Sequence, residues 1–113
     1  MKVSQQEMGN VTVLEPKGKI MIGSGDVKLR DSIESALAGG SNNILVNLER
    51  VSKMDSSGLG ELVAGYNVAK EKGGTVKLTN LPSSLYNVLG AARLLSVFEV
   101  FEDLDEAVKS FES

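Results

Sequence analysis

The chain has 113 residues, of which 42% are apolar, and it carries a formal net charge of -3. This length suits one domain with one core, so we expect a single domain over residues 1–113. The chain contains no cysteine and no histidine, which excludes disulfides, thiolate metal sites and the usual general base of serine hydrolases. We therefore expect a protein that is not an enzyme, with no catalytic residues, no metal and no cofactor.

The negative charge gathers toward the carboxyl-terminal end. From Ser96 onward six acidic residues accompany one base, Lys109. Nucleic-acid affinity depends mainly on basic groups that neutralise phosphates, so we expect no direct nucleic-acid partner. The chain also lacks a long apolar run and a signal-peptide pattern, which favours a cytoplasmic protein without a membrane segment. Other proteins are the expected partners.

A β-hairpin is predicted at the start of the chain. Residues 3–8 are mostly polar, and an apolar run follows Gly9-Asn10, which is typical of two antiparallel strands joined by a tight turn. The first of these strands is expected at the edge of the sheet. We expect Pro16 and Gly18 to end the second strand, because proline has no N–H to donate to a strand ladder.

Helices and strands then alternate. The predicted elements are a helix from near Gly25 to about Ala38, a strand over 43–48, a loop over 49–54, a helix from near Ser57 to Gly73, a strand over 75–79, a helix from Pro82 to Gly90, a strand over 98–101 and a helix from Asp103. This order predicts an α/β domain with a four- or five-stranded, mostly parallel sheet, an antiparallel N-terminal edge strand and about four covering helices. The expected core includes Ile44, Val46, Leu48, Leu62, Val63, Leu78, Leu89 and Val108.

The segment Met54-Asp55-Ser56-Ser57-Gly58-Leu59-Gly60 has two interpretations. In the first it is simply a helix start, capped by Asp55 or Ser56. Capping does not explain two glycines in the first turn, where each costs about 1 kcal/mol relative to alanine. In the second interpretation, Gly58 and Gly60 remove side chains so that another molecule can approach the serines closely. Such a contact or modification site would follow a buried strand, where open α/β sheets place functional loops.

The same segment resembles that of the anti-sigma factor antagonists, also called anti-anti-sigma factors, which are bacterial transcription regulators within the STAS domain superfamily. The resemblance covers nearly the whole chain in matching order. It includes the opening hairpin, Gly18-Lys19-Ile20, the strand over 44–48, Asp55-Ser56-Ser57-Gly58-Leu59-Gly60, Lys72-Gly73-Gly74, and Leu94-Leu95 before Phe98.

The resemblance implies a signal-transduction protein switched by phosphorylation. In that family the unphosphorylated protein binds an anti-sigma factor, which is also a serine kinase, and so releases a sigma factor. The kinase phosphorylates the hydroxyl residue after the aspartate, which is Ser56 here, and a serine/threonine phosphatase reverses the reaction. The implied assembly is a monomer or a weak dimer. The partner-binding residues are expected to be Asp55, Ser56, Ser57, Gly58, Leu59, Met21, Ile22 and Ser24.

Other interpretations remain open at this point. The segment over 20–25 departs from better-known relatives by its glycines and aliphatic residues, so Met21 and Ile22 form either a partner anchor or ordinary packing. An alternative function is a non-phosphorylated STAS scaffold, or a subunit of a lipid-transport or stress-signalling assembly. Gly23-Ser24-Gly25 is a weak match to a nucleotide loop. The acidic residues from Asp103 onward suggest either a cation site or a solvated helix start.

Overall fold

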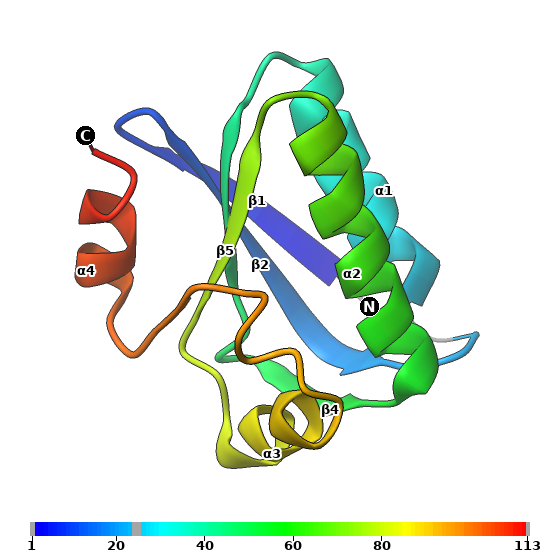
Figure 1. Ribbon diagram of the computed structural model, residues 1–113. Coiled ribbons are helices and arrows are strands. Elements are labelled where there is room, and N and C mark those ends of the chain that lie inside the picture. Colours follow the sequence, from blue (N-terminus) through cyan, green and yellow to red (C-terminus); the bar gives the residue numbers. More distant parts are fainter. Residues whose placement is uncertain (1, 24–25, 113) are drawn as a thin grey trace.

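A mixed β-sheet runs through the middle of the molecule, with helices on both faces (Figure 1). The computed structural model describes residues 2–23 and 26–112. Its elements are β1 (Lys2–Met8), β2 (Val11–Ile20), α1 (Asp26–Ala38), β3 (Asn43–Asn47), β4 (Val51–Met54), α2 (Ser56–Glu71), β5 (Thr75–Thr79), α3 (Ser83–Ala91), β6 (Val100–Phe101) and α4 (Leu104–Lys109).

The predicted sheet is confirmed. Its strands lie in the order β1-β2-β3-β5-β6, and β4 pairs separately with β2. β1 is antiparallel to β2 and lies at the edge, whereas the β2–β3, β3–β5 and β5–β6 pairs are parallel. The central strand, β3, has fully buried aliphatic residues at Ile44, Leu45 and Val46, which is the pattern expected of a strand covered on both faces.

The predicted end of β2 is wrong. The strand continues through Pro16 and Gly18 to Ile20. On one side of β2, β3 pairs with Thr12 to Leu14 and β4 pairs with residues 18–20, so Pro16 lies in the gap between these two partners. A missing N–H there interrupts no ladder on that side of the strand.

The segment predicted as a loop over 49–54 contains β4, which pairs in parallel with the carboxyl-terminal end of β2. Val51 and Met54 are buried, whereas Ser52 and Lys53 are exposed. β6 is shorter than predicted, because it begins at Val100 and not at Phe98. The helix starts agree with prediction within a residue or so, except that the start expected at Gly25 lies outside the described residues.

Two apolar layers pack against the sheet. α1 and α2 lie side by side over one face, and α4 lies on the other (Figure 1). Six of the eight residues predicted for the core are buried; Val63 and Val108 are partly buried and pack against the two core clusters. No helix in the described ranges is long and apolar enough to span a bilayer.

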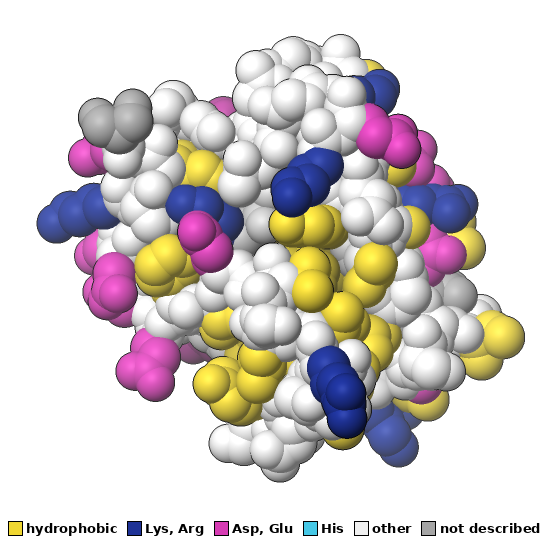
Figure 2. Space-filling view, in the orientation of Figure 1, with side chains coloured by type: hydrophobic (Ala, Val, Ile, Leu, Met, Phe, Trp, Pro, Cys, Tyr) yellow, Lys and Arg dark blue, Asp and Glu magenta, His cyan; other side chains and the backbone are white. Residues whose placement is uncertain are grey.

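On the face covered by α1 and α2, some apolar side chains remain at the surface. In Figure 2 apolar side chains gather at the surface where α2 meets the segment between α3 and β6. The rings of Tyr66 and Phe98 pack edge to face there, with centroids 5.0 Å apart. This arrangement is favourable for aromatic pairs and fixes the segment after α3 against α2.

Candidate functional site

The site is built where β2 and β4 end together. Ile20 is paired with Met54 in the parallel register, and the N–H of Asp55 donates to the Ile20 carbonyl at 3.3 Å. The chain then turns directly into α2 at Ser56. The segments 20–22 and 54–58, which are distant in sequence, therefore lie side by side at the carboxyl edge of the sheet.

Asp55 links these two segments. It is the N-cap of α2, and its Oδ1 accepts a hydrogen bond from the Gly58 N–H at 3.0 Å. Its Oδ2 accepts from the Ile22 N–H at 3.1 Å. The N–H of Gly58 first, and that of Ile22 second, lower the pKa of the Asp55 carboxyl below its ordinary value, because both bonds favour the ionised form. A carboxylate thus joins the helix start to the turn after β2.

The two serines differ in accessibility. Ser56 is the first residue of α2 and is exposed, whereas Ser57 is half-buried. The helix N-terminus presents free N–H groups and a partial positive charge, which favour an anion at this position. Ser56 therefore lies at the surface, at a helix start whose free N–H groups favour a negative charge.

The interpretation that Gly58 removes a side chain so that another molecule can approach the serines is wrong. Gly58 is buried, and a Cβ built on it would lie 2.0 Å from the carbonyl oxygen of Ile20. Gly58 is thus required by the close packing of α2 against β2. At Gly60 a Cβ would meet nothing within 4 Å. Packing inside the domain therefore does not explain why this exposed position is a glycine.

The turn after β2 presents an apolar side chain beside the serines. Ile22 is 74% exposed, whereas Met21 is half-buried. Leu59 is partly buried and packs against the main core. Of the residues expected to bind a partner, Ile22, Asp55, Ser56 and Ser57 are brought together at the surface, and Ser24 lies outside the described residues.

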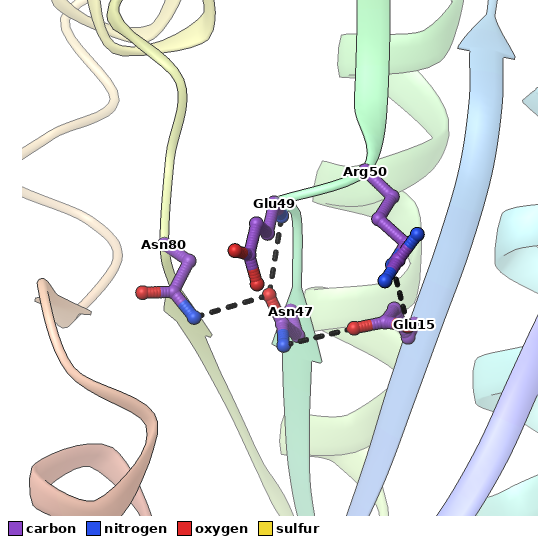
Figure 3. A network of polar contacts seen from close by, with 5 residues as sticks. All are labelled: Glu15, Asn47, Glu49, Arg50 and Asn80. Atoms are coloured by element: carbon purple, nitrogen blue, oxygen red, sulfur yellow. Dashed lines mark hydrogen bonds and ion pairs between the residues drawn. The ribbon is translucent and has the colours of Figure 1, made fainter.

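A polar network at the ends of β3 and β5 was not predicted from the sequence (Figure 3). Asn47 is 4% exposed. Its Oδ1 accepts from the Glu49 N–H at 3.1 Å and from Asn80 Nδ2 at 3.3 Å. Its Nδ2 donates to Glu15 at 3.1 Å, and Glu15 forms an ion pair with Arg50 at 3.5 Å.

The acidic start of α4 is an ordinary capped helix. Asp103 is the N-cap, and its Oδ1 accepts from the Asp105 N–H at 3.3 Å. Over residues 2–23 and 26–112, no group of three or more acidic, histidine or cysteine side chains is arranged to hold a metal ion. The glycine loop at 23–25 falls partly outside the described residues, so the nucleotide interpretation has no structural test there.

Fold and site together define a small α/β domain with an exposed serine at the start of a capped helix. The sequence profile of the STAS domain matches residues 2–107. The chain therefore belongs to the STAS domain family. A search of curated protein sequences finds no match.

Solved structures of the same fold cover almost the whole chain. A candidate anti-sigma factor antagonist from Thermotoga maritima aligns with a TM-score of 0.90 and 20% identity over 98% of this chain and 95% of its own. The Bacillus cell fate determinant SpoIIAA, in its phosphorylated form, aligns with a TM-score of 0.73 and 22% identity over 96% and 98%. A sulfate transporter family protein from Wolinella succinogenes aligns with a TM-score of 0.73 and 18% identity over 91% and 85%.

Proposed function

We propose that this STAS domain is an anti-sigma factor antagonist switched by phosphorylation of Ser56. When unphosphorylated, it binds an anti-sigma factor that is also a serine kinase, and so releases a sigma factor. A serine/threonine phosphatase resets it. The observation that carries this proposal is the exposed hydroxyl of Ser56 at the first position of α2, beside the exposed Ile22 that Asp55 holds in place.

The electrostatics of the helix start explain how such a switch works. A phosphate adds about -1.5 to -2 charges at pH 7. Within the domain, the N-terminal dipole and free N–H groups of α2 offset part of that charge. A partner surface that fits a neutral hydroxyl instead meets added like charge, and like-charge juxtaposition costs several kcal/mol. Since about 1.4 kcal/mol changes affinity tenfold, phosphorylation releases the partner.

Two structural neighbours bear on this choice. SpoIIAA has been solved in a phosphorylated form, which supports a phosphorylated state for a domain of this shape. The sulfate transporter family protein supports the alternative, in which the domain is a non-phosphorylated scaffold or a subunit of a transport assembly. The serine at position 56 favours the first function, since a scaffold has no need of an exposed hydroxyl there.

The test is phosphorylation by the cognate kinase with ATP, followed by mass spectrometry of the peptides. We expect one phosphate on Ser56. Ser56→Ala should accept none but still bind the kinase, because a methyl group leaves the contact surface almost unchanged. Ser57→Ala is the matched control and should be phosphorylated normally.

Ser56→Asp should bind the kinase more weakly, because its charge faces the partner. The free energy of unfolding should change by no more than about 1 kcal/mol in the Ser56 variants, which is the size of one cap. Phosphate on Ser57 would move the site by one residue. Binding of Ser56→Asp as tight as that of the parent protein would refute the electrostatic mechanism and favour the scaffold.

A further inference from the structure

A second surface feature lies at the carboxyl ends of β5 and β6, and its lining does not include Ser56 or its neighbours in the chain. An open groove of about 410 Å³ has apolar walls that include Leu81, Pro82 and Phe101. Tyr86, which is 50% exposed, lines it from α3. A second hollow of about 320 Å³ shares Leu81, Tyr86 and Glu102 with the first. The two hollows therefore continue one another on either side of Tyr86 and Glu102.

The polar rim of this groove is held in place by the network at Asn47. Asn80 has a positive φ of 56°, and its Nδ2 donates to the buried Asn47 side chain. Its amide oxygen points away from Asn47 (Figure 3). The backbone N–H of Glu49 donates to the same Asn47 oxygen, so the side chain of Asn80 and the backbone of Glu49 are held in place before any ligand arrives. Such anchoring lowers the ordering cost of binding.

The charged side chains that line the groove are both carboxylates. Glu49 and Glu102 are exposed carboxylates that line it, and neither belongs to any of the ion pairs between described residues. The cations near these segments already have partners: Arg50, which follows Glu49 in the chain, is paired with Glu15 at 3.5 Å, and Lys77 of β5 is bound to Glu99 at 2.9 Å and to Ser110 at 3.0 Å. Two carboxylates and an amide oxygen beside aromatic rings suit a cation with several N–H donors.

We propose that this groove binds an extended peptide segment of a partner protein through an arginine side chain. A guanidinium group is planar, carries several donors that match carboxylates and stacks on aromatic rings such as that of Tyr86. The paired hollows and their apolar walls accommodate the residues on either side of the arginine. The groove is lined by Glu49, by the segment between β5 and α3, by α3 and by the end of β6, and not by Ser56. We therefore expect its occupant to bind whatever the state of Ser56.

The test uses nuclear magnetic resonance titration of the full chain with a blocked peptide, Ala-Leu-Arg-Leu-Ala. We expect saturable shifts of the amides of Asn80, Tyr86 and Glu102. The same peptide with citrulline in place of arginine keeps the shape and loses the charge, and should bind about tenfold more weakly, as for the loss of a charge-assisted contact. Blocked arginine alone should bind more weakly than the peptide, because it leaves the second hollow empty.

Variants of the protein locate the contact. Glu102→Gln and Tyr86→Ala should each weaken the arginine peptide about fivefold, the size of a partly exposed charge or cation–π contact. Glu71→Gln, at the far end of α2, removes the same charge elsewhere and should bind as the parent does. Ser56→Ala should also bind normally, which separates this site from the switch. Equal affinity for the citrulline peptide, shifts confined to α4, or no saturable binding would each overturn the proposal.

Discussion

At Gly58 the backbone of α2 approaches β2 more closely than any side chain allows. A Cβ there would lie 2.0 Å from the Ile20 carbonyl oxygen, and backbone cannot move aside as a flexible side chain can. We expect Gly58→Ala to lower the free energy of unfolding by at least 1–3 kcal/mol, as overpacking does. Gly60→Ala is the control and should raise it by up to about 1 kcal/mol, because alanine is the better helix former and nothing lies in the way. Chemical denaturation measures both, and a neutral Gly58→Ala would contradict the close packing.

The Asp55 carboxylate should make stability depend on pH. Its pKa in the folded protein lies below the ordinary value of 3.8. Above that value Asp55 is ionised in both the folded and the unfolded protein, and its contribution to the free energy of unfolding is fully present. As the pH falls, the unfolded protein binds the proton first, and this contribution is lost as the pH passes through the pKa of the folded protein. Asp55→Asn keeps a capping oxygen but cannot titrate. We expect the stability difference between the parent and Asp55→Asn to shrink below about pH 4 in urea unfolding series, and parallel curves would contradict this.

Among the elements, those identified correctly from the sequence have either a clear apolar pattern or, as in the β1–β2 hairpin, a clear turn signal at Gly9-Asn10. β3 was found because Ile44 to Val46 form a continuous aliphatic run, and α2 because its apolar residues recur at helical spacing. β4 was missed because only Val51 and Met54 are apolar, with two exposed residues between them. Its pairing depends on the far end of β2, which was itself predicted to stop at Pro16. Local patterns do not report such pairing between distant segments.

The candidate site also contains residues that the sequence identified and contacts that it did not. The serines and Asp55 were identified from one contiguous segment. The Asn47–Asn80 contact joins residues 33 positions apart, and it forms only because β3 and β5 pair in parallel with Asn47 opposite Thr79. One signal could have revealed it. A polar residue ends each of two neighbouring buried strands, and in a parallel sheet those ends lie at the same edge.

The packing of α2 can be tested at Leu62, which is 0% exposed in the main core. Leu62→Ala should lower the free energy of unfolding by about 2–5 kcal/mol, as buried leucine truncations do. Val68→Ala, a partly buried residue on the same helix, should cost clearly less. Thermal or urea unfolding distinguishes the two. A loss below about 1 kcal/mol for Leu62→Ala would show that the helix buries a different face.

At the scale of the whole molecule, the two faces of the sheet are protected unequally. α1 and α2 cover one face with 13 and 16 residues, whereas α4 has only six residues on the other. The smaller core cluster there contains Val11, Val13, Leu45 and Ala107. A helix this short has little stability of its own, so its attachment depends on contacts with the sheet.

Lys77 is the main polar contact that holds α4 in place. It is 9% exposed, and its Nζ donates to the Ser110 carbonyl and Oγ at 3.0 Å and lies 4.4 Å from the Phe111 ring centroid. Lys77→Met keeps the apolar stem but removes these bonds and leaves the Ser110 carbonyl without its donor. We expect the free energy of local opening of α4, measured by amide hydrogen exchange, to fall by about 1–3 kcal/mol, while exchange in α2 is unchanged. Lys109→Met, at an exposed position on α4 itself, is the control and should leave exchange as in the parent. If Lys77→Met left the protection of Ala107 intact, apolar packing alone would hold the helix on the sheet.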